Sequence, residues 1–114
     1  MPLLFSYGTL QQEEAQLSTF GRKLEGERDL LLGYEPSLVK IPDPAVAERL
    51  GKTHHDNINL TGDDWSNVQG TVFEVTDDEL AKADRFEAEF AYERVNAALA
   101  SGKEAWVYVH APKK

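Results

Sequence analysis

The stretch LLFSYGTL, at residues 3–10, decides the architecture that we expect for this chain. Its apolar start predicts a short buried strand, and Gly8 followed by Thr9 marks an abrupt end to that strand. The polar run over residues 11–17 is typical of the start of a helix. A strand, a glycine-containing loop and a helix start, in this order, expose backbone N–H groups that can hold a carboxylate or a phosphate. A tight turn in which Gly8 takes a positive φ is the simpler alternative, and the lysine of a nucleotide-binding P-loop is absent.

The composition limits the class of protein. The chain has 114 residues, of which 41% are hydrophobic and 28% are charged, and this suits one domain over residues 1–114. The formal net charge of −8 argues against nucleic acid and anionic membranes as partners. The chain contains no cysteine, which excludes disulfides and a thiolate nucleophile and fits a cytoplasmic location. We expect neither a secretory signal nor a membrane span, because the N-terminus lacks a basic start and no apolar run reaches ~18 residues.

Outside the opening stretch, hydrophobic periodicity and turn residues predict most of the remaining elements. The predicted elements are a weakly amphipathic helix over residues 13–22 that Gly21 or Gly26 closes, strands over residues 27–34, 68–75, 95–99 and 105–109, turns over residues 61–64 and 101–103, and a frayed end over residues 112–114. Gly70, inside one of these strands, indicates either a bulge or a close approach of another backbone.

The middle of the chain carries the weakest pattern. Three prolines, Pro36, Pro42 and Pro44, exclude their surroundings from a central position in a sheet. We therefore expect residues 42–66 to be irregular, with one or two helical turns over residues 45–50. A polar connection of this length usually carries function or is mobile.

The clearest local signal is the capping box TDDE at residues 76–79, which predicts a helix that continues through Glu87. On this helix Asp84 and Glu87 follow Leu80 at the i+4 and i+7 positions of the face that turns toward the core. A carboxyl group in such a place needs a partner or a raised pKa, and a desolvated carboxyl is what a general base near neutral pH requires.

Two simpler explanations cover the same two carboxylates. The helix can fray by Glu87, so that this side chain is solvated, or the acids can form ion pairs with Arg85 or Arg94. The residues alone favour these explanations over catalysis.

Several stretches, in order along the chain, resemble the gamma-glutamylcyclotransferase-like family, also called the avirulence-induced-gene-like family. They are YGTL at residues 7–10, VQGTVF at residues 68–73, DRFE at residues 84–87, YERV at residues 92–95 and AWVYV at residues 105–109. Each stretch alone is a weak signal, but the ordered set is specific. One departure is Ala88, where the family commonly has glycine directly after the acidic residue, so the backbone conformation after Glu87 stays open.

The resemblance implies an α+β fold, a small mixed β-barrel flanked by helices, with a pocket between the loop at residues 7–10 and Glu87. It implies that the loop holds a γ-glutamyl moiety and that Glu87 is the proton acceptor. In the implied reaction the α-amine of the substrate attacks its own γ-carbonyl, which gives 5-oxoproline and releases an amine without a metal or other cofactor. The substrate-binding residues that the resemblance implies are Tyr7, Gly8, Thr9, Leu10 and Tyr92. Tyr92 is favoured because it lies just beyond Glu87 and within the matched motif.

Two classes of function follow. The first is an enzyme that acts on γ-glutamyl amines, with Glu87 as base and then as acid, provided that its pKa lies above the ordinary value of roughly 4.3. The second is a protein that binds a γ-glutamyl or carboxylate ligand without turnover. In both cases the partner is a small molecule, and Glu87 favours the first class.

The remaining polar and aromatic side chains have structural alternatives to a functional role. His54, His55 and Asp56 suggest a metal site, but a polar loop at the pocket mouth is the better interpretation, and a solvated loop is better still. Tyr108 is expected either to line the pocket or to pack in the barrel. Trp65 and Trp106 are expected in the core or at the rim. Arg94 is expected to pair with Glu87 or Asp84, and Asp84 to anchor an arginine or a backbone N–H group.

Overall fold

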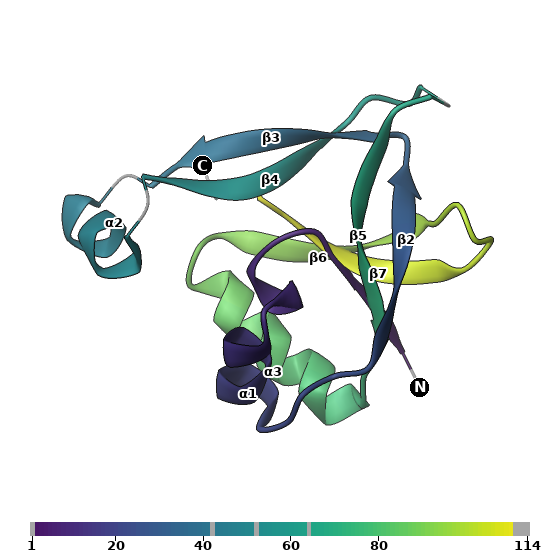
Figure 1. Cartoon of the computed structure of the whole chain (residues 1–114). Coiled ribbons are helices and arrows are strands. Elements are labelled where there is room, and N and C mark those ends of the chain that lie inside the picture. The colour runs from purple at the N-terminus through teal and green to yellow at the C-terminus, as the bar shows by residue number, and fades with distance from the viewer. Residues whose placement is uncertain (1, 42, 52, 64, 111–114) are drawn as a thin grey trace.

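The computed structural model describes residues 2–41, 43–51, 53–63 and 65–110, with only the backbone of Thr9 and Leu50. Its elements, shown in Figure 1, are β1 (Leu3–Ser6), the 3-10 turn η1 (Thr9–Gln11), α1 (Glu13–Phe20), β2 (Gly26–Leu32), β3 (Tyr34–Lys40), α2 (Pro44–Leu50), β4 (His54–Leu60), β5 (Asn67–Glu74), α3 (Asp77–Ala88), β6 (Tyr92–Ala98) and β7 (Glu104–His110).

The central strand of the main sheet is β1. The five strands lie in the order β2-β5-β1-β7-β6, with β1 antiparallel to β5 and parallel to β7. Leu4 is fully buried against the core on the helix side, and its neighbour Phe5 is equally buried against the core on the other face. The prediction of a buried strand that ends before Gly8 is therefore confirmed.

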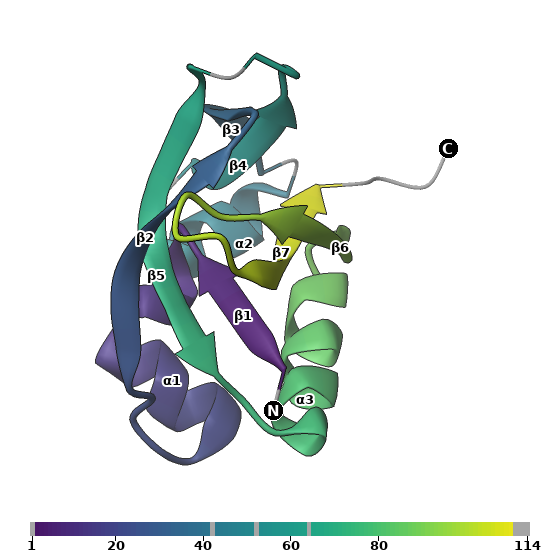
Figure 2. The same ribbon diagram turned by 90° about the vertical axis from the view of Figure 1, so that its right-hand side faces the viewer.

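The two longer helices, α1 and α3, pack on one side of this sheet (Figures 1 and 2). Phe20 of α1 and Leu80 and Ala83 of α3 join Leu4 in one hydrophobic cluster. The predicted α+β fold with flanking helices is confirmed, and the sheet is mixed as expected. The strands do not close into a complete barrel, because β2 and β6 are the two edges of the sheet, and the bridge between Leu31 and Leu99 lies just beyond the end of β6.

Within residues 42–66, the one or two helical turns expected over residues 45–50 are confirmed, but the expectation that the rest is irregular is wrong for residues 54–60. This part of the chain contains α2 and β4, and β4 pairs antiparallel with β3 in a separate two-stranded sheet. Pro36 lies in β3 opposite Ile58, in a strand with a single neighbour, so the exclusion of this proline from a central sheet position is confirmed. Three predictions concern residues that the structure does not describe. They are the prediction for Pro42, that for the end at residues 112–114, and the last residue of the predicted turn over residues 61–64.

Several element boundaries differ from the prediction by a few residues. Gly21 closes α1 in a left-handed conformation, with φ of 76°, so Gly21 rather than Gly26 ends this helix. The strand β6 begins at Tyr92, three residues earlier than expected, because the chain reverses directly after α3. Within the described ranges, no helix is both long and apolar enough to cross a membrane.

Gly70 marks a close approach, not a bulge. The register of β5 is continuous against both β1 and β2. A Cβ atom added to Gly70 would clash with the carbonyl oxygen of Ser6 and would lie 2.5 Å from the ring of Phe5. The central strand can therefore pack this tightly only because residue 70 has no side chain.

We expect the substitution Gly70→Ala to lower the free energy of unfolding by about 2 kcal/mol or more, because the added methyl group must displace Phe5 or the β1 backbone. Urea unfolding of the variant measures the loss. Glu74→Ala, an exposed position at the end of the same strand, is the matched control and is expected to be close to neutral. An unchanged midpoint for Gly70→Ala would contradict the close approach.

The predicted capping box at the start of α3 is confirmed, and Glu79 has a second role there. Its side chain accepts a hydrogen bond from the backbone N–H of Thr76 at 2.9 Å, and Arg22 donates to both carboxylate oxygens at 2.7 and 2.8 Å. The hydrogen bonds from Arg22, together with the Thr76 N–H, lower the pKa of the buried Glu79 carboxyl to about 2 despite the opposing effect of burial. This carboxylate ties α3 to the segment that follows α1.

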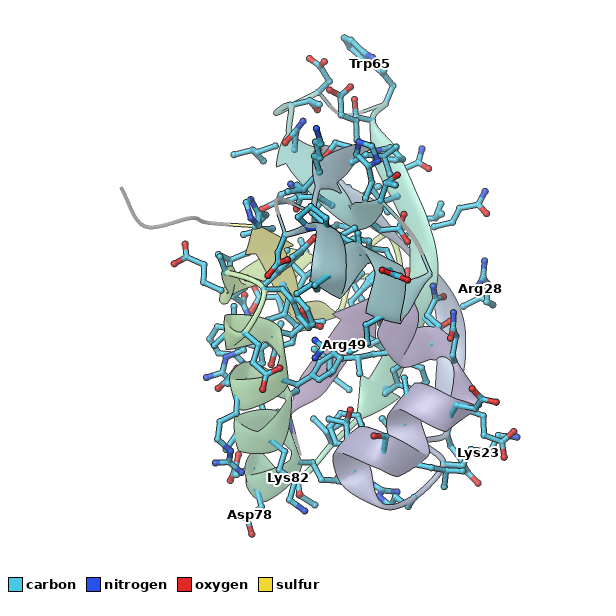
Figure 3. All side chains as sticks on the ribbon, turned by 90° about the vertical axis from the view of Figure 1, so that its left-hand side faces the viewer. Lys23, Arg28, Arg49, Trp65, Asp78 and Lys82 are labelled. Atoms are coloured by element: carbon cyan, nitrogen blue, oxygen red, sulfur yellow. The ribbon has the colours of Figure 1, made fainter. Side chains whose placement is uncertain are left out.

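Because the pKa of Glu79 is lower in the folded state, its contribution to stability is present above the unfolded value of 4.5 and is lost as the pH falls toward about 2. We expect Glu79→Gln to lose about 2 kcal/mol near neutral pH, as is typical of hydrogen bonds to a charged group. We also expect this variant to show a smaller further loss between pH 5 and pH 2 than the original chain. Urea midpoints across this range measure both effects, with Asp78→Asn, exposed in the same helical turn (Figure 3), as control. An acid profile identical to that of the original chain would contradict the assignment.

Candidate active site

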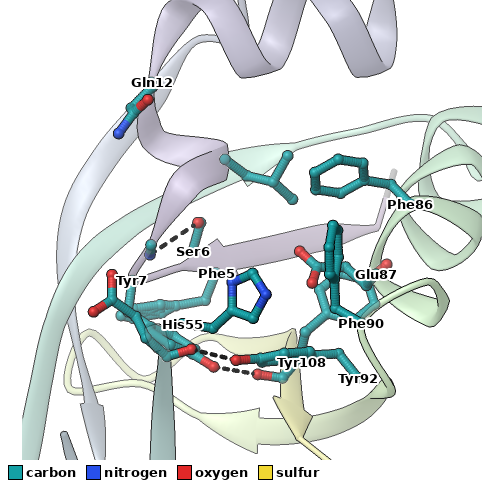
Figure 4. A pocket seen from close by; sticks show the side chains of 13 residues that line it. Phe5, Ser6, Tyr7, Gln12, His55, Phe86, Glu87, Phe90, Tyr92 and Tyr108 are labelled. Carbon is teal, nitrogen blue, oxygen red and sulfur yellow. Dashed lines mark hydrogen bonds between the residues drawn. The ribbon is translucent and has the colours of Figure 1, made fainter. Parts of the chain in front are cut away.

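A cavity of about 280 Å³ opens between the end of β1, the C-terminal end of α3 and strand β4 (Figure 4). It brings together side chains from segments that are far apart in the sequence. The residues that line it are Phe5, Ser6, Tyr7, Gly8, Leu10, Gln12, His55, Asp56, Phe86, Glu87, Phe90, Tyr92 and Tyr108.

The loop after β1 is fixed at both of its ends. The carbonyl of Gly8 accepts a hydrogen bond from the Gln11 N–H at 3.1 Å, and the carbonyl of Leu10 accepts one from the buried side chain of Gln16 at 2.9 Å. The N–H of Gly8 has only a long contact of 3.4 Å with Ser6 Oγ. The loop is thus preorganised, and the N–H group of Gly8 is weakly held beside the cavity.

Three tyrosines form the floor of the cavity, and each hydroxyl donates a hydrogen bond. Tyr7 donates to the carbonyl of Tyr108 at 2.6 Å, Tyr92 to the carbonyl of Asp56 at 2.6 Å, and Tyr108 to the Asp84 carboxylate at 2.7 Å. Burial, reinforced by nearby negative charge, raises the pKa of Tyr92 to about 12 and raises those of Tyr7 and Tyr108 further. The three hydroxyls therefore stay protonated and hold the walls together.

The two carboxylates of α3 have different surroundings. Asp84 receives the Tyr108 hydroxyl and lies 3.5 Å from Nε of Arg94, whose guanidinium covers the ring of Trp106 at 4.4 Å. Asp84 is thus an anchor for an arginine, as expected. Glu87 is half-buried and lines the cavity, and Figure 4 shows it across the cavity from Ser6 and Tyr7.

Ala88, at the position where the family commonly has glycine, is the last residue of α3 and keeps the helical conformation. The chain reverses three residues later at Ala91, which has a φ of 63° although it carries a side chain. The N–H groups of Phe90 and Ala91 donate to the carbonyls of Glu87 and Ala88 at 3.0 and 3.1 Å. The backbone at Glu87 is therefore helical and fixed without a glycine after it.

The structure brings most of the predicted site residues together. Tyr7, Gly8, Leu10, Tyr92 and Glu87 all line the cavity, as does Tyr108, which was expected there or in the core. Thr9 begins η1, and its side chain lies outside the described part of the structure.

The sequence did not single out Phe86, near the end of α3, or Phe90, in the turn that follows it, and it placed Asp56 only within the polar loop of His54 and His55. His55 is a partial success, because it was placed at the pocket mouth but in a loop. It lies in β4, and its ring packs edge-on against Phe90, with ring centroids 4.8 Å apart. The proximity of Phe86 and Phe90 to Glu87 on one helix end was a usable signal. The signal for Asp56 was its place next to His55 in the polar stretch interpreted as a loop at the pocket mouth, although β4 itself was not predicted.

The metal interpretation of the adjacent histidines finds no support in the geometry. His54 is exposed and contacts Thr53 Oγ1 at 2.9 Å, while His55 faces the cavity. In the part of the chain that the structure describes, no three His, Asp or Glu side chains are grouped to hold a metal ion. Of the tryptophans, Trp106 packs at the edge of the core, whereas Trp65 is 79% exposed and points away from the molecule (Figure 3), so the expectation for Trp65 is wrong.

Comparison with known proteins gives a family and a fold. The model of the family described as "Gamma-glutamyl cyclotransferase, AIG2-like" matches residues 4–114. No curated protein matches the chain. A solution structure from Arabidopsis thaliana has a TM-score of 0.72 at 23% identity, and the match covers 96% of this chain but 61% of that one. A crystal structure of a Homo sapiens protein has a TM-score of 0.72 at 17% identity, and a structure named gamma-glutamyl cyclotransferase has a TM-score of 0.68 at 18% identity. Each of these two matches covers 98% of this chain and 68% of the other chain.

The hydroxyl of Tyr92 provides a test of how the cavity is held. We expect Tyr92→Phe to lower the free energy of unfolding by about 1 kcal/mol, because it leaves the Asp56 carbonyl without its donor. We also expect faster hydrogen exchange of the His110 N–H, which donates to Asn57 Oδ1 at 3.0 Å and reports on the contact of β4 with β7. Tyr34→Phe, in β3 and outside the cavity, is the matched control. Unchanged exchange at His110 would show that the hydroxyl does not hold β4 in place.

Proposed function

The chain belongs to the gamma-glutamyl cyclotransferase, AIG2-like family, and we propose on this basis that it is a γ-glutamyl cyclotransferase in which Glu87 exchanges protons with the substrate. The observation that carries the proposal is that Glu87 and the loop containing Tyr7 and Gly8 line one small cavity. They are far apart in the sequence, so the fold is what brings an acid to a loop with backbone donors.

The proposed reaction is an intramolecular aminolysis. The α-ammonium group of a γ-glutamyl amine loses a proton to Glu87, and the α-nitrogen then attacks the γ-carbonyl carbon. A tetrahedral oxyanion forms and collapses, the bond from the γ-carbon to the leaving nitrogen breaks, and the leaving nitrogen takes up protons. A zwitterionic substrate thus gives 5-oxoproline, with a net charge of −1, and an ammonium ion, so atoms and charge balance.

The inventory of groups in the cavity supports Glu87 as the proton carrier. The hydroxyls of the three lining tyrosines have raised pKa values and donate to other protein groups, so they do not accept protons near neutral pH. Among the described lining residues this leaves the carboxylates of Glu87 and Asp56 and the imidazole of His55. The resemblance of residues 84–87 to the acidic motif of the family selects Glu87 among the three.

The loop supports the binding half of the proposal. The Gly8 N–H donates to Ser6 Oγ at the long distance of 3.4 Å. A hydrogen bond from this N–H to a ligand would therefore replace only a weak contact. A backbone donor fixed in this way can hold the α-carboxylate of the substrate or the oxyanion at little reorganisation cost. The cavity, at about 280 Å³, suits a γ-glutamyl group folded for ring closure, and such positioning supplies much of the rate in an intramolecular reaction.

The test is the formation of 5-oxoproline by the purified chain from a panel of γ-glutamyl amines and γ-glutamyl amino acids. We expect turnover by the original chain and a loss of at least about 100-fold in Glu87→Gln, the range typical of a general acid–base group. Glu89→Gln, an exposed carboxylate at the same helix end and outside the cavity, is the matched control and is expected to keep its activity.

Each other outcome has a defined meaning. Equal product from both chains would remove Glu87 from the mechanism. Binding of γ-glutamyl ligands without product, measured by calorimetry, would replace the enzyme by a binding protein with the same pocket. Neither binding nor product would limit the family relationship to the fold.

A further inference from the structure

Asp56 is a second carboxylate at the cavity, and the resemblance of the chain to its family assigns it no role. A Cβ atom placed on Gly8 would lie 3.7 Å from both Cβ and Oδ2 of Asp56, so the carboxylate lies beside the loop that carries the backbone donors. Asp56 lines the cavity that contains Glu87, and with Tyr7 it also lines a neighbouring cavity of about 380 Å³. Its side chain is exposed, and it stands where a ligand on the loop would meet it.

The backbone at Asp56 is held by contacts of the residue itself and of both its neighbours. Its own carbonyl accepts the Tyr92 hydroxyl at 2.6 Å. On one side, His55 packs against the ring of Phe90, and on the other, Asn57 Oδ1 accepts the N–H of His110 at 3.0 Å. The position of the carboxylate relative to the loop is therefore set by the main body of the molecule, although β4 belongs to a separate small sheet.

The charges of the cavity are one-sided. Among the described residues that line it, Asp56 and Glu87 are the acids, and none is a lysine or arginine. Both carboxylates contribute to the raised pKa values of Tyr7 and Tyr92, after the larger effect of burial, so their negative charge acts on the interior of the cavity. A cationic group is favoured at this wall, and an anionic group is favoured only at the backbone donors of the loop.

A γ-glutamyl group fits this division because its α-carbon carries one ammonium and one carboxylate. Two groups on the same carbon need binding partners that are neighbours. The Gly8 N–H and the Asp56 carboxylate are such neighbours, and Glu87 faces them from the other side of the same cavity, from where it takes up the proton in the proposed reaction.

We propose that Asp56 binds the α-ammonium group of the substrate and so selects ligands that carry a free α-amine. The inference rests on the proposed function and names the residue that distinguishes substrate from product. Cyclisation converts the ammonium into a neutral lactam N–H, so Asp56 attracts the zwitterionic substrate and repels the anionic 5-oxoproline. The same carboxylate thus favours binding before the reaction and release after it.

The experiment compares three ligands by calorimetry: a γ-glutamyl amine, the glutaryl amide of the same amine, which lacks only the α-ammonium group, and 5-oxoproline. Binding is measured in Glu87→Gln, which removes turnover, with and without Asp56→Asn. We expect Asp56→Asn to weaken binding of the γ-glutamyl amine at least about tenfold, the loss typical of a hydrogen bond to a charged group. Binding of the glutaryl amide and of 5-oxoproline is expected to stay the same or to tighten.

Glu35→Gln, an exposed carboxylate in the strand that pairs with β4, changes the net charge equally and is the matched control. Thermal unfolding of each variant checks that the small sheet is intact. An equal loss for the γ-glutamyl and glutaryl ligands would assign Asp56 to the leaving amine and overturn the proposal, as would no loss for either. If the original chain, with both Glu87 and Asp56 intact, neither binds nor converts any γ-glutamyl ligand, the proposed function itself fails. Turnover with an unchanged preference for the α-amine would remove only the role of Asp56.

Discussion

The whole molecule depends on a four-residue strand that is hydrogen-bonded on both sides. β1 lies between β5 and β7 and buries Leu4 and Phe5 on opposite faces, so both hydrophobic clusters are built on it. Its pairing with β5 ends at Ser6, and the chain must then leave the sheet at Tyr7. The mouth of the cavity is fixed at this point because a doubly paired central strand cannot shift its register without disrupting both clusters.

Tyrosine hydroxyls connect this strand to the rest of the cavity. Tyr7 reaches the carbonyl of Tyr108 in β7, and Tyr92 of β6 reaches the carbonyl of Asp56 in β4, both at 2.6 Å. These hydrogen bonds are accepted by backbone carbonyl groups of β7 and β4. The bond from Tyr92 also attaches the two-stranded sheet to the five-stranded sheet. The stability of β4 and the shape of the site therefore have a common origin.

Local patterns in the sequence predicted those parts of the fold that local physics determines. The capping box placed α3, and Gly70 inside a strand pattern indicated either a bulge or a close approach, of which the structure has the close approach. β4 was missed because HHDNINL is mostly polar and contributes only Asn57 and Ile58 to the buried interior. Its strand conformation comes from pairing with β3 and from the hydroxyl of Tyr92, contacts that join distant parts of the chain. Because this strand was missed, Asp56 was placed only in a polar loop with His54 and His55, and its position beside Gly8 was not predicted.

The acids around the cavity show how one helix end can hold two carboxylates with different chemistry. Asp84 and Glu87 are three residues apart, so they share a helix face but differ by about 60° in direction, given ~100° of rotation for each residue. That difference turns Asp84 toward Tyr108 and Arg94, where it is bound as an anion, and turns Glu87 toward the cavity. Arg94 at the same time stacks on Trp106, which fixes its guanidinium beside Asp84. The sequence motif DRFE thus contains both a carboxylate that holds an arginine and a carboxylate that lines the cavity.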